Sequence, residues 1–181
     1  EERWGGEMNW KPSNRGSDSI YAESIHTNRW ETFGTYELPM APDVKFQFSG
    51  NGHIQNSYYG VTPYKADQYI GFGQLTWNTP VGNKHSLLLG GAYRYTYYDD
   101  NTFATLSEDG FNNNPSIMHL PGIFIQDEIN LNEWQKLLLG IRYDYNSIHG
   151  NVFSPRANYK WSSIDKNEII RLSVGLSLIH I

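Results

Sequence analysis

The sequence contains no cysteine among its 181 residues, which excludes a disulfide scaffold and any metal site built from thiolates. It also lacks an apolar run of about 18 residues, so we expect no transmembrane helix. The net charge of −5 provides no basic patch, and we expect no nucleic-acid partner. No charged-then-apolar segment resembles a signal peptide, so an exported protein would be a mature form or a fragment.

Residues 44–57 show the strongest pattern in the chain. Even positions from Val44 to Ile54 are apolar or glycine, whereas odd positions from Lys45 to Ser57 are all polar. This period of two predicts a β-strand with two different faces. Ordinary strands have about 5–6 residues, whereas crossing a bilayer at a tilt takes roughly 9–11. We therefore expect Phe46 and Phe48 to face lipid, and three polar residues to face a lumen: Gln47, Asn51 and His53.

The same alternation recurs along the chain, and no segment shows the 3.6-residue apolar stripe of a helix. The predicted fold is all-β: a section of an antiparallel up-and-down transmembrane β-barrel with about nine long strands and no significant helix. The predicted strands are 2–11, 20–38, 44–59, 66–79, 84–98, 120–131, 136–147, 152–162 and 168–175.

The predicted connections alternate between two classes. Short turns are expected at 39–43, 79–83, 132–135 and 163–167, and longer polar links near 12–19, 60–65, 99–119 and 148–151. Short periplasmic turns and longer extracellular loops are typical of outer-membrane barrels. Three tryptophans, Trp77, Trp134 and Trp161, lie beside the short turns, while tyrosines cluster beside the long links, as in two interfacial girdles.

Two segments fit this pattern poorly. In 20–38, the charged residues Glu23, Arg29, Glu31 and Glu37 share parity with Tyr21, Ile25 and Phe33. Asp127 has the parity of Ile123, Ile125 and Ile129. Because charge on a lipid face is costly near the membrane midplane, we expect these charges near the rim, or a bulge that resets the parity.

Three consecutive motifs carry a family resemblance. They are residues 122–128 (GIFIQDE), 137–144 (LLLGIRYD) and 153–156 (FSPR). In this order and at this spacing they resemble the barrel of TonB-dependent outer-membrane receptors, and 91–95 (GAYRY) echoes the same strand type. The resemblance is specific over about 40 residues and is one of pattern alone over 1–119.

The resemblance implies active uptake in the outer membrane of a Gram-negative bacterium. Extracellular loops would capture a scarce ligand, such as a ferric siderophore, haem or cobalamin, and a TonB-type protein would act through a plug domain. The chain resembles an internal section of such a barrel, with residues 1–175 as the partial barrel. Residues 176–181 depart from the family pattern, and we interpret them either as an artefact of truncation or as divergent sequence.

No residue pattern points to catalysis, and we expect no enzyme activity, no cofactor and no metal site. The six histidines lack the spacing of metal ligands. The pairs Asp99–Asp100 and Glu108–Asp109 are interpreted as solvated loop charge, with calcium ligation as the alternative.

Binding is a better interpretation of the polar residues. We predict that one set faces the lumen, where it pairs internally and contacts a plug: Gln126, Glu128, Arg142, Asp144, Arg156, Lys160 and Arg171. A second set on the long links is predicted to contact a small-molecule or metal-chelate ligand: Tyr58, Tyr59, Tyr64, Tyr98, Asp99, Asp100 and Asn113.

Two other functions remain open at this stage. One is a passive porin or adhesin-like barrel without energy coupling, which upstream sequence for a plug would distinguish. The other is a soluble β-rich carbohydrate-binding or hydrolytic domain, in which Trp4, Trp10 and Trp30 would form a sugar-stacking face. Dependence of solubility on detergent separates the soluble domain from both barrels.

Overall fold

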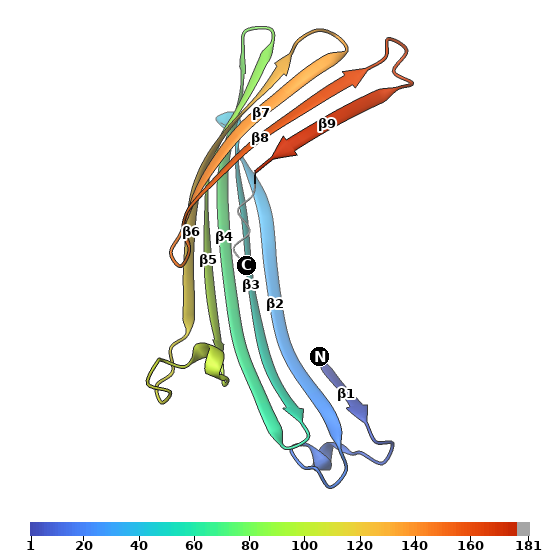
Figure 1. The fold of residues 1–181 in the computed structure, drawn as a ribbon, viewed down its shortest axis with the longest axis vertical. Coiled ribbons are helices and arrows are strands. Elements are labelled where there is room, and N and C mark those ends of the chain that lie inside the picture. The colour runs from blue at the N-terminus through green and yellow to red at the C-terminus, as the bar shows by residue number, and fades with distance from the viewer. Residues whose placement is uncertain (177–181) are drawn as a thin grey trace. The chain divides into compact units, whose positions relative to one another are not determined.

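The computed structural model describes residues 1–176, and nine strands account for most of them (Figure 1). The strands are β1 (Glu2–Gly6), β2 (Ala22–Leu38), β3 (Ala41–Tyr59), β4 (Thr62–Val81), β5 (His85–Asp100), β6 (Ser116–Asn130), β7 (Gln135–Asn146), β8 (Gly150–Ser162) and β9 (Ile169–Gly175). Two single-turn 3-10 helices, η1 (Pro12–Asn14) and η2 (Phe103–Thr105), are the only helices in this part of the chain. Neither is long or apolar enough to cross a membrane.

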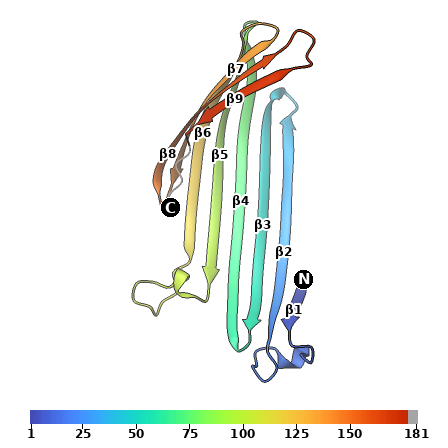
Figure 2. The same ribbon diagram turned by 45° about the vertical axis from the view of Figure 1, so that its right-hand side comes forward.

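All nine strands belong to one antiparallel sheet, in which neighbours in sequence are neighbours in space (Figure 2). The predicted all-β, up-and-down fold is confirmed, and the strand boundaries agree within about four residues except at the first strand. That strand ends at Gly6 instead of residue 11, because the chain turns there. The Trp10 amide donates to the Glu7 carbonyl at 3.0 Å, and the Trp10 ring stacks on Trp4 at 5.1 Å. Residues 176–181, which we expect to depart from the family pattern, lie almost wholly outside the described residues.

Two of the four predicted long links are wrong. The β3–β4 connection is only Gly60–Val61, and the β7–β8 connection spans residues 147–149. Gly60 has φ +61°, which suits a two-residue hairpin turn. The long connections are residues 7–21 and 101–115, and the first of them contacts the β3–β4 turn through Asp18, whose carboxylate accepts from the Val61 amide at 3.1 Å.

The sheet is divided between two compact units, to each of which β2–β6 contribute. Unit 1 comprises Glu1–Phe33, Ser49–Gly71 and Tyr95–Met118, and unit 2 comprises Gly34–Phe48, Phe72–Arg94 and the chain from His119 onward. The two long connections belong to unit 1. The turns between β2 and β3, β4 and β5, β6 and β7, and β8 and β9 belong to unit 2.

In unit 2, the strand registers separate an apolar face from a polar face. Ile125 lies opposite Ile141, which lies opposite Pro155. One residue further along β6, Gln126 lies opposite Gly140, which lies opposite Arg156. The same registers place the predicted lumen-facing set on one face, from Gln126 on β6 to Arg171 on β9. That this face is the lumen stays a prediction.

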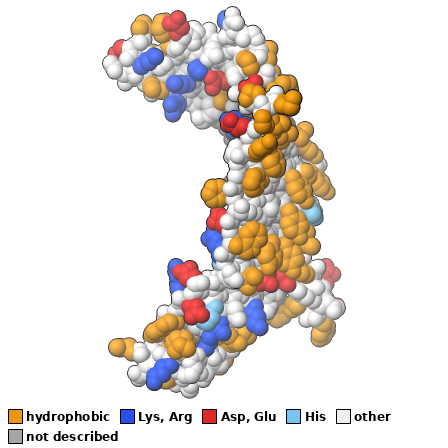
Figure 3. All heavy atoms as spheres, turned by 180° about the vertical axis from the view of Figure 1, so that it is seen from behind, with side chains coloured by type: hydrophobic (Ala, Val, Ile, Leu, Met, Phe, Trp, Pro, Cys, Tyr) orange, Lys and Arg blue, Asp and Glu red, His pale blue; other side chains and the backbone are white. Residues whose placement is uncertain are grey.

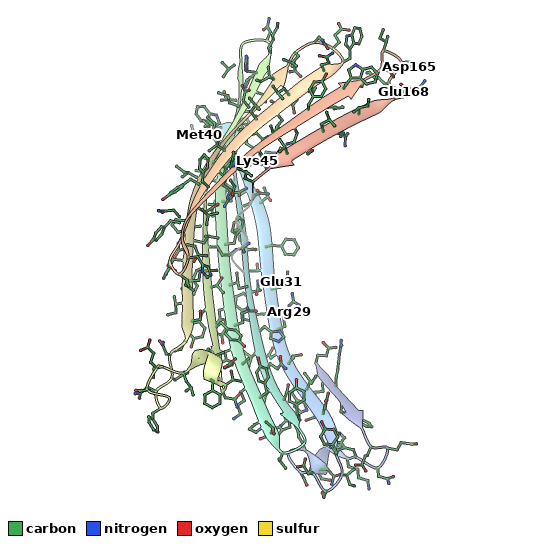
Figure 4. All side chains as sticks on the ribbon, viewed as in Figure 1. Arg29, Glu31, Met40, Lys45, Asp165 and Glu168 are labelled. Carbon is green, nitrogen blue, oxygen red and sulfur yellow. The ribbon has the colours of Figure 1, made fainter. Side chains whose placement is uncertain are left out.

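The charges of β2 turn out to share the polar face. The Trp30 ring lies against Gly50 and Gly52, so Trp30 is on the apolar face and its neighbours Arg29 and Glu31 are on the other. Arg29 and Glu31 form an ion pair at 3.3 Å within β2 (Figure 4). The expectation that these charges need a rim position or a bulge was therefore wrong for this pair. The exception is Phe33, an apolar residue that shares the polar face with Arg29 and Glu31 and is 78% exposed.

Asp127, by contrast, does lie on the apolar face. Its register with Leu139 is unbroken, so no bulge resets the parity. Asp127 Oδ2 pairs with His85 Nδ1 at 2.7 Å, and His85 is the first residue of β5. The charge therefore lies close to the short-turn end of the strands, as the sequence predicted.

Within residues 1–176 no second layer packs on either unit, so this part of the chain has little core. The only buried hydrophobic residues among those described are Trp10, Ala22, Ala66 and Ala92. Large hydrophobic side chains are instead exposed along the strands, and Figure 3 shows them gathered in a band away from most of the charged side chains. A single sheet with one apolar face needs either a membrane or another layer to cover that face.

Candidate functional site

Three of the seven predicted ligand-binding residues line a hollow in unit 1. The hollow has a volume of about 590 Å³ and is lined by β3, β4, β5 and the 101–115 connection. Asp99, Asp100 and Asn113 from the predicted set line it, together with Lys65 and Asp67. The hollow therefore combines carboxylate, amide and ammonium groups at the ends of long strands.

Asp100 organises the connection that borders this hollow. Its Oδ1 accepts from the Thr102 amide and the Thr102 hydroxyl, each at 2.8 Å, and from the Thr105 hydroxyl at 3.0 Å. Its Oδ2 accepts from the Tyr98 hydroxyl at 2.8 Å. Thr105, only 1% exposed, also donates to the Asp100 carbonyl at 2.6 Å. Asp100 therefore holds the start of the connection in place.

Asp99 and the two tyrosines complete the cluster. Asp99 Oδ2 accepts from the Asn113 amide group at 3.0 Å, while Asp99 Oδ1 is buried without a hydrogen-bond partner among the described residues. The Tyr64 and Tyr98 hydroxyls lie 3.0 Å apart. Hydrogen bonds thus link Tyr64, Tyr98 and Asp100 in one group and Asp99 and Asn113 in another.

None of the four predicted tyrosines lines the hollow, and Tyr58 and Tyr59 lie outside both groups. The Tyr58 ring lies under the Arg15 guanidinium at 4.6 Å, and Arg15 also donates to the Asn56 carbonyl at 2.7 Å. Tyr58 thus helps to anchor the 7–21 connection. Tyr59 is the last residue of β3 and is 38% exposed.

The tip of the 101–115 connection is rigidly built around Asp109. The Asp109 carboxylate accepts from the Ser107 hydroxyl at 2.5 Å and from the Phe111 and Asn112 amides at 2.9 and 3.1 Å. These hydrogen bonds, that from Ser107 first, hold the pKa of Asp109 below its usual value. Asp109 is exposed, as expected for a solvated loop charge, and it also accepts hydrogen bonds from the connection itself.

The 101–115 connection presents two aromatic residues that the sequence pattern did not single out, Phe103 in η2 and Phe111 at the tip. Phe103 and Phe111 are 90% and 92% exposed, although they belong to a connection held by internal hydrogen bonds. The available signal was the presence of two phenylalanines in an otherwise polar segment. Ordered, exposed aromatic rings offer contact area at low entropic cost.

The polar face of unit 2 carries a second group of charged side chains. Arg142 donates to both oxygens of Asp144 at 2.7 Å and lies over the Phe124 ring at 5.6 Å. Two further residues of the predicted lumen set, Arg156 and Gln126, are hydrogen-bonded to each other, and Glu128 pairs with Lys136 at 2.6 Å. Lys160 and Arg171 face each other in register.

None of these clusters has the composition of a catalytic or metal centre. Within residues 1–176, no group of three or more His, Asp or Glu side chains is placed to hold a metal ion. The carboxylates are engaged by hydroxyls and amides rather than by a general base or nucleophile. The arrangement suits binding of a polar molecule.

Comparisons with known proteins agree with this description. The model of a family described as TonB dependent receptor-like, beta-barrel, matches residues 3–177. The crystal structure of the siderophore receptor PirA from Pseudomonas aeruginosa is similar, with a TM-score of 0.59 and 16% sequence identity. The likeness covers 85% of this chain but only 26% of PirA, so the chain spans about a quarter of that receptor. At this identity it shows the fold alone. No curated protein matches.

Proposed function

The chain belongs to the TonB-dependent receptor-like β-barrels, outer-membrane proteins of Gram-negative bacteria, and from this premise we propose that it is a section of a receptor for energy-coupled uptake. The observation that carries the proposal is the sheet of long two-faced strands, matched by the family over residues 3–177. The family consists of transporters, not enzymes. The family match favours this interpretation over a passive barrel or a soluble carbohydrate-binding domain.

In this proposal, the two faces of the sheet contact different surroundings. The face with Phe46, Ile125 and Ile141 contacts outer-membrane lipid, because its exposed side chains are apolar. The face with Arg142 and Arg156 lines the lumen. Its paired charges are suited to contact a plug domain, through which a TonB-type protein of the inner membrane delivers energy.

The ligand site in this proposal is the hollow beside the 101–115 connection. The amide and carboxylate groups of Asn113 and Asp99 in the hollow supply polar contacts, and the exposed rings of Phe103 and Phe111 on the same connection supply aromatic surface. Such a mixture suits a bulky polar ligand of the ferric siderophore, haem or cobalamin class. PirA is a siderophore receptor, which makes a ferric siderophore the first class to test.

Uptake by the full-length receptor tests this function. A strain deprived of its own receptors is supplied with the full gene and grown on a ferric siderophore, haem or cobalamin as the limiting source. Growth on one class that is lost without the TonB-type partner supports the proposal. Growth independent of that partner contradicts it and supports a passive channel.

Removal of both exposed rings tests the site. Phe103→Ala with Phe111→Ala should weaken ligand binding by about tenfold or more, as expected for aromatic groups at the centre of an interface. The matched control is Ile164→Ala, which removes a 79% exposed apolar side chain in the β8–β9 turn and should leave binding unchanged. Equal affinity of both variants and the parent would place the ligand elsewhere.

A further inference from the structure

Unit 1 contains a second cavity, beside β1, β2 and β3, which we call the basic cavity. It has a volume of about 350 Å³ and shares no residue with the hollow beside the 101–115 connection. Its lining combines two arginines and a histidine with one acidic, one hydroxyl and one aliphatic side chain: Arg3, Arg29, His53, Glu1, Thr27 and Ile25.

Strand alternation places this cavity on the polar face of the sheet. The Trp30 ring lies against Gly52 on the apolar face. Because successive side chains of a strand point to opposite faces, the neighbours of these two residues, Arg29 and His53, project from the polar face. Arg3 joins them there, since its partner in the β1–β2 register has the same parity as Arg29.

The positive groups of the cavity keep donors available for a further acceptor. Arg29 donates to Glu31 through Nη2 alone, at 3.3 Å (Figure 4), which engages one of the several N–H donors of a guanidinium. Arg3 donates to Glu1 through Nε at 2.5 Å. The two arginine side chains are 63% and 74% exposed, so an anion can reach both without displacing either glutamate.

Guanidinium groups select planar oxyanions, because their paired N–H donors match the two oxygens of a carboxylate. The volume lies near the lower end of the range for ligand pockets, about 300–1,000 Å³, so the cavity suits one group of a ligand instead of a whole bulky chelate. The hollow is lined instead by Asp67, Asp99 and Asp100 against the single ammonium of Lys65. A carboxylate group is therefore favoured in the basic cavity and disfavoured in the hollow.

We propose that the basic cavity binds a carboxylate group of the transported ligand through Arg3 and Arg29. The inference rests on the proposed function and narrows its ligand classes. A ferric polycarboxylate siderophore and haem, through its propionates, both offer free carboxylates. Cobalamin and neutral ferric hydroxamates offer none, so the proposal disfavours them as ligands of this receptor.

Ligand affinity of the purified full-length receptor in detergent tests the cavity. The probes are ferric citrate and haemin, which carry carboxylates, and a neutral ferric trihydroxamate, each titrated by calorimetry. We expect one of the two carboxylate probes to bind, and Arg29→Gln to weaken that binding about tenfold, the loss expected for a hydrogen bond between charged groups. Arg29→Lys keeps the charge without the planar fork and should recover only part of the affinity.

The matched control is Lys45→Gln. Lys45 also carries one positive charge, but it pairs with Glu37 at 2.7 Å near the β2–β3 turn and does not line the cavity. Because an exposed ion pair of this kind contributes little, the variant should bind the carboxylate probe within about twofold of the parent. Equal weakening by Arg29→Gln and Lys45→Gln, or none by either, overturns the proposal.

The unmodified receptor keeps the test valid if Arg29→Gln fails to fold. Its affinity for the carboxylate probe should fall severalfold between about 0.05 M and about 0.5 M salt, because ions screen exposed charges. Affinity that does not depend on salt, or binding of the neutral trihydroxamate in place of both carboxylate probes, overturns the proposal and leaves the uptake function standing. Growth on the bound probe that persists without the TonB-type partner contradicts the proposed function instead, and leaves the carboxylate site standing.

Discussion

At the scale of single residues, Asp127 carries a charge on a face where its neighbours Ile125 and Ile129 are apolar. The charge is tolerated because His85 contacts one carboxylate oxygen at 2.7 Å. The other oxygen, Oδ1, is buried without a partner among the described residues, and a buried charge that loses its partner is costly. His85 therefore stabilises the charge of Asp127, a role that its isolated position in the sequence does not suggest.

Replacement of His85 should expose this dependence. His85→Leu should destabilise the full-length barrel by about 1–2 kcal/mol, within the range for charge near the edge of a lipid-facing surface. The measurement is the shift in urea midpoint for folding into lipid vesicles. The double variant His85→Leu with Asp127→Leu removes both charges and should recover most of the loss. If the double variant is no more stable than the single one, Asp127 does not depend on His85.

At the scale of elements, the 101–115 connection is ordered by its own polar groups instead of by a hydrophobic core. The Asp100 and Asp109 carboxylates accept hydrogen bonds from the backbone and hydroxyls on either side of η2 and at the tip. This arrangement keeps Phe103 and Phe111 exposed. Carboxylates that accept several hydrogen bonds favour the charged form, so acid should loosen the connection only when it protonates them.

The pH response of the tip follows from the lowered pKa of Asp109. Because the pKa is lower in the folded state, the ionised carboxylate stabilises the tip at pH values above the pKa of the unfolded chain, which is about 3.9. This stabilisation is lost as the pH falls through the pKa of the folded state. The Asp109 carboxyl resonance in NMR should therefore titrate well below about 3.9, whereas a peptide of residues 105–113 titrates near it. A titration in the protein at the peptide's value would contradict the hydrogen bonding at the tip.

Local sequence patterns predict some of these elements and miss others. The long strands from β3 to β8 follow from alternation, because one face is largely apolar and the period of two persists for many residues. The parity of β2 could not be assigned in this way. It depends on Trp30 lying over Gly50 and Gly52, which belong to another strand.

The predicted lengths of two connections were wrong for a related reason. Residues 60–65 have the polar and turn-forming composition of a loop, yet only Gly60–Val61 leave the sheet. The 7–21 connection supplies Asp18 to the Val61 amide and so satisfies the tight turn from outside. For the hollow, sequence reasoning identified Asp99, Asp100 and Asn113 as polar loop residues. The Asn113–Asp99 hydrogen bond, the bonds from Thr102 and Thr105 to Asp100, and the exposure of Phe103 and Phe111 depend on a turn geometry that composition does not specify.

At the scale of the whole molecule, the nine-stranded sheet is open. β1 and β9 each have only one neighbour in the sheet, and the exposed hydrophobic side chains include Ile170, Leu172 and Val174 on β9. Unpaired backbone groups at a sheet edge promote association with other strands, and lipid cannot satisfy them. The described residues therefore form a part that needs further strands to complete it.

Isolated expression tests this directly. Residues 1–181 alone should aggregate in aqueous buffer and should not form a monodisperse species even in detergent, because both edges remain unpaired. Size-exclusion chromatography with light scattering measures the outcome, and the full-length receptor in the same detergent is the control. A monodisperse, folded fragment in buffer without detergent would reject the membrane interpretation.

The aromatic rings that cover glycines favour one register between neighbouring strands. A slip of two residues between strands keeps each side chain on its face, so hydrophobicity cannot detect the error. It would, however, replace Gly90 beneath Phe124 by Leu88 or Ala92, whose side chains would overlap the ring. Gly90 and Phe124 therefore favour the native register of their strands, and we expect these two positions to change together in evolution.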